Sequence, residues 1–105
     1  HLPHMLAFGL VDSLARQEES EEIFRYAAGG FRDFTRIASS DPVMWRDICL
    51  YNREALLGAM DNYQNDLAEL RLAIEAGDAA ALQSIFSRAK TARDQFVGGA
   101  NGDDE

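Results

Sequence analysis

The chain has 105 residues, 47% of them hydrophobic, and 18 acidic against 10 basic residues give it a formal net charge of −8. This length fits one small domain, and the apolar content excludes intrinsic disorder over most of it. The negative charge argues against nucleic acid as a partner, and no apolar run approaches the roughly 20 residues that cross a bilayer. The single Cys49 excludes an intramolecular disulfide.

The first half of the chain predicts short helices. Pro3 can begin a helix that continues to Arg16, and its apolar residues lie on almost all sides, so we expect a central buried helix. An acidic segment leads into a short helix over residues 21–28, which Gly29-Gly30 should end. The chain opens directly into a helix, so we expect it to be a piece of a longer protein. It shows no leader sequence, so we expect a cytoplasmic protein.

A second short helix is predicted over residues 31–39, with two distinct faces. By three- and four-residue spacing, one face is apolar and the other is polar. The apolar face holds Phe31, Phe34 and Ala38, and the polar face holds Arg32, Thr35, Arg36 and Ser39.

The next predicted helix is unusually long. Asp41-Pro42 is a strong helix start, and no proline or glycine pair follows before Gly77, so one helix is predicted over residues 42–76. At ~1.5 Å per residue it is roughly 50 Å long, which exceeds a globule of this size. It has a main apolar stripe and a second apolar face, which favour a homodimer over a bent or broken helix in a monomeric bundle. The stripe contains Trp45, Ile48, Asn52, Leu56, Met60, Tyr63, Leu67, Leu70 and Ile74, and the second face contains Leu50, Leu57 and Leu72.

Gly77 is expected to end this helix, and Asp78 to cap a last helix that reaches Phe96. Residues 97–105 then read as a disordered acidic tail. No strand pattern or repeat is present, so the predicted fold is an all-α helical bundle, residues 1–96, with one long central helix.

Positive charge gathers in one part of this acidic chain. Residues 25–53 hold five arginines against three aspartates, 5 − 3 = +2, whereas the rest carries 5 − 15 = −10. Arg32 and Arg36 are four residues apart, so both guanidinium groups can reach one small dicarboxylate. The alternative is that they form ion pairs with Asp33, Asp41 or acidic helices.

Other chemistry has less support. His1 and His4 flank Pro3 without a third ligand, so no metal site is predicted. No glycine-rich phosphate loop follows a strand, and no catalytic triad can be assembled. Trp45 is either a core residue or a wall of a ligand site, and His4 either an interior residue or a hydrogen-bonding group in that site.

Two segments, HLPHMLAFGLVDSL at residues 1–14 and GGFRDFTRIASSDPVMWRDI at residues 29–48, resemble the C-terminal helical domain of prephenate dehydrogenases. The resemblance covers roughly residues 1–96. It implies an enzyme that oxidises prephenate to 4-hydroxyphenylpyruvate in tyrosine biosynthesis, with loss of carbon dioxide and hydride transfer to NAD or NADP. The cofactor would be bound mainly by a separate N-terminal domain. This half would dimerise and complete the substrate pocket.

The resemblance also implies roles for individual residues. Arg36 would anchor a substrate carboxylate and His4 would face the pocket. Arg32, together with Asp33, would reach the site of the partner subunit. Trp45 would line or gate the pocket. Gly29 and Gly30 would let the helix that bears Arg32 and Arg36 approach the pocket closely.

The general base would belong to the N-terminal half, so we expect no catalytic residue in this chain and no activity from it alone. Arogenate as the substrate of the same family remains an alternative. So does a stand-alone helical dimer that binds a small anion.

Overall fold

A computed structural model of the chain describes residues 1–25 and 29–99, and every element within them is helical. The all-α prediction is therefore confirmed. The described chain forms two compact units, residues 1–61 and the residues from Asn62 onward, where one helical domain was predicted. No helix in the described ranges combines the length and apolarity needed to span a bilayer.

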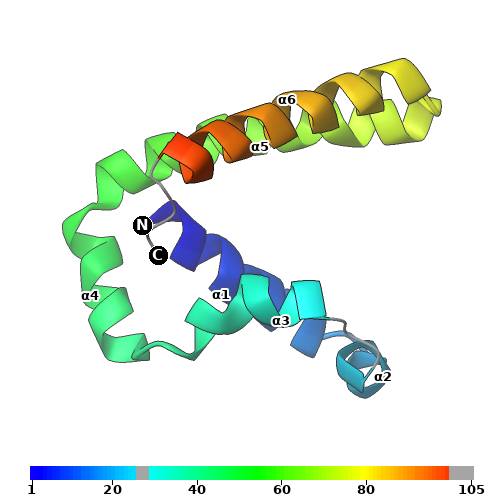
Figure 1. Cartoon of the computed structure of the whole chain (residues 1–105). Coiled ribbons are helices and arrows are strands. Elements are labelled where there is room, and N and C mark those ends of the chain that lie inside the picture. Colours follow the sequence, from blue (N-terminus) through cyan, green and yellow to red (C-terminus); the bar gives the residue numbers. More distant parts are fainter. Residues whose placement is uncertain (26–28, 100–105) are drawn as a thin grey trace. The chain divides into compact units, whose positions relative to one another are not determined.

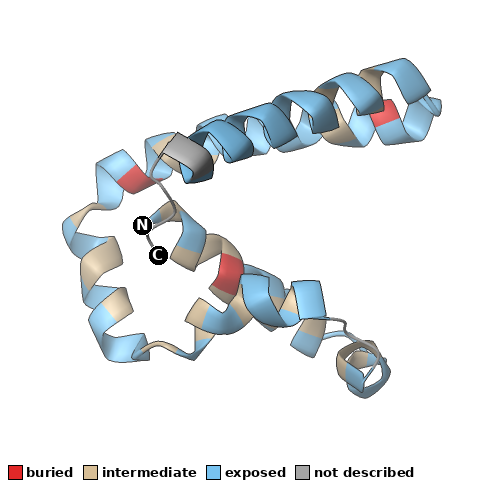
Figure 2. Cartoon of the chain, viewed as in Figure 1, coloured by how far each residue is buried: buried red, intermediate tan, exposed pale blue. Residues whose placement is uncertain are grey.

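The first unit is built around α1 (Leu2–Ala15), which contacts α2 (Ser20–Arg25), α3 (Gly29–Thr35) and the short 3-10 helix η1 (Arg36–Ser39). Figure 1 shows α3 and η1 running beside α1. The predicted start of α1 is confirmed, with Pro3 in its first turn. Its predicted burial is wrong, because Ala7 is its one buried residue (Figure 2). Among the described residues, the elements that contact α1 do not cover this apolar helix on all sides.

The predicted helices at residues 21–28 and 31–39 need correction. The first is α2, which ends at Arg25, and residues 26–28 of the prediction lie outside the described ranges. Gly29 and Gly30 begin α3, so they belong to the next helix. The second prediction covers most of α3 and all of η1. The chain changes from α-helical to 3-10 geometry at Arg36, so it is not the single regular helix that was predicted. Phe34, on the predicted apolar face, is half exposed, whereas Thr35, on the predicted polar face, donates a hydrogen bond to the Phe31 carbonyl oxygen (2.7 Å).

The predicted helix over residues 42–76 is divided at Asn52 into α4 (Pro42–Tyr51) and α5 (Arg53–Ala76). Its start is confirmed, since the Asp41 carboxylate accepts a hydrogen bond from the Val43 amide (3.0 Å). Asn52 departs from helical geometry at φ −106° and ψ 29°, and its side-chain amide donates to the Ile48 carbonyl oxygen (3.0 Å). A side chain that bonds to the backbone in this way competes with the helix. A single overlong helix was therefore the wrong prediction.

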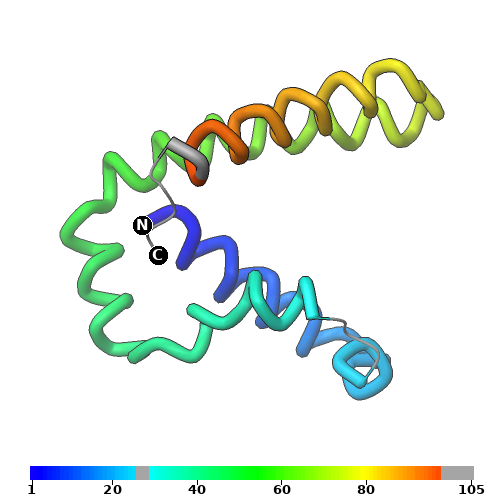
Figure 3. The backbone as a smooth tube through the Cα atoms, in the orientation of Figure 1, coloured from blue at the N-terminus to red at the C-terminus, as the bar shows by residue number. Residues whose placement is uncertain are grey.

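The second unit consists of the C-terminal part of α5 and α6 (Ala79–Gly99), which reverse direction at Gly77 (Figure 3). Gly77 has φ +63°, its amide donates to the Ile74 carbonyl oxygen, and the Asp78 amide donates to that of Ala73. This pair of bonds is the Schellman motif. Asp78 then caps α6 by accepting from the Ala81 amide (3.0 Å). Both predicted boundaries are confirmed.

The end of α6 differs from the prediction. Helix α6 continues to Gly99, so the first three residues of the tail predicted at 97–105 are helical. Residues 100–105 of that tail lie outside the described ranges. The glycine pair at its end did not stop the helix, because glycine lowers helix stability without forbidding helical geometry.

The apolar residues of α4 and α5 divide into covered and uncovered sets. The covered set includes Leu56 and Ala73, which are buried. On the predicted stripe, Leu67 and Ile74 are 47% and 61% exposed. All three residues of the predicted second apolar face, Leu50, Leu57 and Leu72, are also exposed. Among the described residues of α4 and α5, exposed apolar side chains therefore outnumber buried ones.

Candidate functional site

His4 and Trp45 form the best-defined constellation among the predicted site residues. They lie in the first turns of α1 and α4, and their rings stack with centroids 3.7 Å apart and planes 17° apart. The His1 ring meets the same indole edge-on, with centroids 5.7 Å apart and planes 79° apart. One tryptophan thus contacts both histidines of the chain.

A contact between two sulfur atoms also joins α1 and α4. The Cys49 thiol donates to the Met5 thioether sulfur across 3.0 Å. Cys49 follows Trp45 by four residues, so both lie on one face of α4. A shallow, mostly apolar hollow of about 230 Å³ lies beside this contact. It is lined by Met5, Phe8, Pro42, Trp45, Arg46 and Cys49. This pairing could not be predicted from the sequence, because 44 residues separate Met5 from Cys49.

The two predicted carboxylate-binding arginines are exposed and lie on neighbouring elements. Arg32 is in α3, and Arg36 is the first residue of η1. Both elements contact α1, the helix that carries His4. Within the described ranges neither guanidinium group forms an ion pair, so the alternative of pairing with Asp33 or Asp41 has no support there. The charge of each arginine remains available to a ligand.

The structure gives less information on the remaining predicted site residues. Asp33 is exposed in α3, beside Arg32. At Gly29 and Gly30, no described atom lies within 4 Å of a built Cβ, and the close approach expected there stays a prediction. Among the described residues, no group of three or more histidine, cysteine, aspartate or glutamate side chains is placed to hold a metal.

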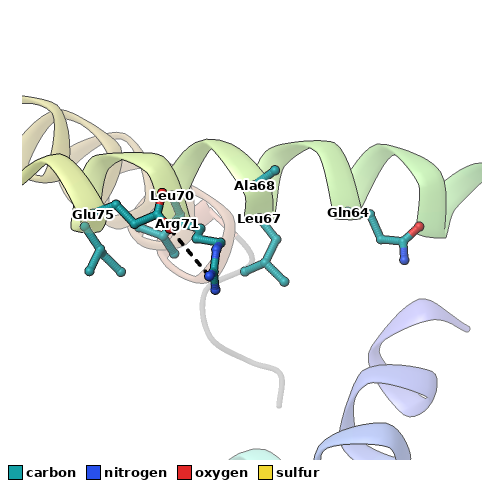
Figure 4. A pocket seen from close by; sticks show the side chains of 7 residues that line it. Gln64, Leu67, Ala68, Leu70, Arg71 and Glu75 are labelled. Atoms are coloured by element: carbon teal, nitrogen blue, oxygen red, sulfur yellow. Dashed lines mark ion pairs between the residues drawn. The ribbon is translucent and has the colours of Figure 1, made fainter.

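Another hollow, on α5, contains none of the predicted site residues. It is an open groove of about 620 Å³ along one face of α5, where Leu67, Ala68 and Ile74 provide apolar surface (Figure 4). An ion pair between Arg71 and Glu75 (3.4 Å) borders it. Its other lining residues are Gln64 and Leu70. An apolar strip with charged borders is typical of a helix that packs against another helix.

Comparison with known proteins gives this arrangement its context. The family model "Prephenate dehydrogenase, dimerization domain" matches residues 1–88. The chain belongs to this family. The resemblance inferred from residues 1–14 and 29–48 is thereby confirmed.

Relatives of this prephenate dehydrogenase dimerization domain agree with the assignment. The chain is 43% identical over 95 residues to the prephenate dehydrogenase of Bacillus subtilis, covering 90% of the chain and 26% of that protein. It is 42% identical over 95 residues to the cyclohexadienyl dehydrogenase of Zymomonas mobilis, covering 89% of the chain and 32% of that protein. The chain spans about a quarter to a third of the curated relatives it matches.

A solved structure supports the same family. The crystal structure of Synechocystis arogenate dehydrogenase superposes with a TM-score of 0.85 at 26% sequence identity. The match covers 92% of the chain and 36% of that structure. The helical fold of this prephenate dehydrogenase dimerization domain is thus shared with about a third of that structure.

Proposed function

We propose that this chain is the dimerisation and substrate-binding part of a prephenate dehydrogenase. The whole enzyme would convert prephenate to 4-hydroxyphenylpyruvate with loss of carbon dioxide and with NAD or NADP as the oxidant. The observation that carries this proposal is the family match over residues 1–88, which includes every proposed substrate-binding residue. These residues are His4, Arg32, Asp33, Arg36 and Trp45.

The described residues do not fit a dinucleotide site. Such a site places the pyrophosphate at a glycine-rich turn between a strand and a helix, and only helices occur in the described ranges. The nicotinamide cofactor is therefore assigned to another part of the enzyme. We assign no step of hydride transfer to residues of this chain.

Arg36 is proposed to hold a substrate carboxylate. Its guanidinium group is exposed and is free of described ion pairs, so binding a carboxylate breaks no existing pair. A planar guanidinium can donate two parallel hydrogen bonds to a carboxylate, which fixes orientation as well as position. Orientation of the substrate is a large part of what protein side chains contribute when a cofactor performs the oxidation.

We further propose that the enzyme is a homodimer through the apolar face of α5. The family model is described as a dimerization domain, and Leu67 and Ile74 on this face are about half exposed. Complete burial of a fully exposed Leu or Ile contributes about 1.5–3 kcal/mol, so covering one that is half exposed contributes roughly half of this, and a repeated strip can stabilise a dimer. Arg32 and Asp33 are assigned, as before, to the site of the partner subunit.

Substitution of Arg36 in the full-length enzyme tests the substrate site. Arg36→Ala should raise the KM for prephenate by roughly 30- to 1000-fold, since a charge-assisted contact is lost. Lysine should restore only part of the affinity, because it lacks the planar fork. Arg88→Ala is the matched control, an exposed arginine of α6 outside the proposed site.

The fold should survive Arg36→Ala, because the side chain is exposed and bonds to no described partner. A lowered melting temperature with an unchanged KM for prephenate would reject the assignment.

Arogenate is the second candidate substrate. The similarity to Synechocystis arogenate dehydrogenase and to a cyclohexadienyl dehydrogenase favours testing it. Arogenate carries an amine where prephenate carries a keto group, and both retain carboxylates for Arg36. A comparison of kcat/KM for the two compounds in one enzyme preparation decides between them.

A further inference from the structure

We propose that Trp45 acts as a positioning residue for His4, and that its indole fixes the plane of the imidazole that faces the substrate. The inference rests on the proposed function, in which His4 contacts the substrate. It adds a physical role for Trp45 that differs from lining the pocket. The carrying observation is the parallel stack of the two rings at 3.7 Å and 17°.

The stack restrains the plane of the His4 ring directly. No described residue exchanges a hydrogen bond with its imidazole. The second side-chain torsion of histidine is broad, so backbone geometry alone leaves the ring plane undefined. A parallel contact over one ring face limits that rotation. Both ring nitrogens lie in the ring plane and point sideways, so stacking leaves them free for a ligand.

Trp45 is suited to this role because its own position is fixed. It lies in the first turn of α4, where the Asp41 cap holds the Val43 amide and Pro42 sets the backbone. The Met5–Cys49 contact fixes the register of α1 and α4 one turn away. Loss of the indole therefore leaves a second contact between the helices. We expect the fold to persist while the imidazole plane becomes free.

A double-mutant cycle in the full-length enzyme tests whether Trp45 acts through His4. Trp45→Leu keeps an apolar side chain and should lower kcat/KM for prephenate about two- to tenfold, the size of an aromatic pair. Trp45→Phe keeps an aromatic face and should restore most of the loss. In the His4→Ala background, Trp45→Leu should change kcat/KM less than about twofold, since residues that act as one unit are not additive.

Tyr51→Leu is the matched control for removal of an aromatic ring. Tyr51 lies in the same helix and is 90% exposed, so kcat/KM should stay unchanged.

Proton NMR of the 105-residue chain provides a readout that a merely structural role would not move. The chain holds two histidines and one tryptophan, so few ring signals need assignment, and His1→Gln identifies those of His4. Ring current from a stacked indole shifts the His4 imidazole protons upfield. Trp45→Leu should remove this shift, and Tyr51→Leu should retain it.

The outcomes separate the two proposals. Additive losses in the cycle, or His4 signals that ignore Trp45→Leu, would overturn the positioning role while leaving His4 as a substrate contact. Full activity of His4→Ala would remove His4 from the site, and the positioning role with it. Loss in His4→Ala together with non-additivity and the predicted shift supports both.

Discussion

Gly77 offers the sharpest test of how the second unit is built. It ends α5 with φ +63°, a conformation that costs residues with a Cβ roughly 1–2 kcal/mol. No described atom lies within 4 Å of a Cβ built there, so Gly77→Ala introduces backbone strain without a clash among the described residues. Alanine also restricts the unfolded chain, which offsets about 0.4–1 kcal/mol. The expected net loss in the free energy of unfolding is therefore about 1 kcal/mol.

The matched control is the same substitution inside the helix that Gly77 ends. Gly58 in α5 also has no atom within 4 Å of a built Cβ, but its φ is not positive. Gly58→Ala should raise the free energy of unfolding by about 0.5–1 kcal/mol, because alanine favours a helix. The two substitutions are thus expected to have opposite signs.

Thermal and urea unfolding at one fixed protein concentration measure both variants, since the stability of a dimer depends on concentration. A loss of 1 kcal/mol corresponds to a fall in Tm of about 4–8 °C for a domain of 60–100 residues. Gly77→Asn should lose less than Gly77→Ala, because asparagine tolerates this conformation better. If Gly77→Ala is neutral, or follows Gly58→Ala in sign, the assigned helix end is wrong.

Two further predictions concern the caps and the apolar face of α5. Asp78→Ala and Asp41→Ala each remove a side-chain cap, and each should lower the free energy of unfolding by about 1 kcal/mol in urea titrations; Asp78→Asn, which keeps an acceptor oxygen, should lose less. Leu67→Asp should shift the enzyme toward monomer in sedimentation experiments by placing a charge on the proposed dimer face, whereas Leu72→Asp, on another face of α5, should not. The reverse ranking of these two leucines would move the interface to the second apolar face.

Local signals in the sequence predicted most of the helix boundaries. Asp41-Pro42, Gly77 and Asp78 act through their own backbone and side-chain chemistry, and the structure confirms all three. The prediction of one continuous helix between them was wrong at Asn52, although asparagine is a weak helix former. Whether such a residue breaks a helix depends on the packing around it, and here its amide binds the Ile48 carbonyl oxygen.

The candidate site shows the same division. The spacing of Arg32 and Arg36 placed them on one helical face, but the change to 3-10 geometry at Arg36 puts them on successive elements. The sequence singled out His4 and Trp45 separately, without indicating that their rings touch. A stack between residues 41 positions apart depends on how two helices pack, which periodicity within either helix does not encode.

By itself, the sequence determined the helical class, the caps and the family of this protein, because these depend on short-range chemistry and on motif spacing. The tertiary structure decided which apolar residues are covered and which side chains meet. Leu56 is buried, while Leu67 and Ile74 on the same predicted stripe remain exposed. Periodicity marks an apolar face, but burial requires a second element to lie against it, and for part of α5 the described part of the chain supplies none.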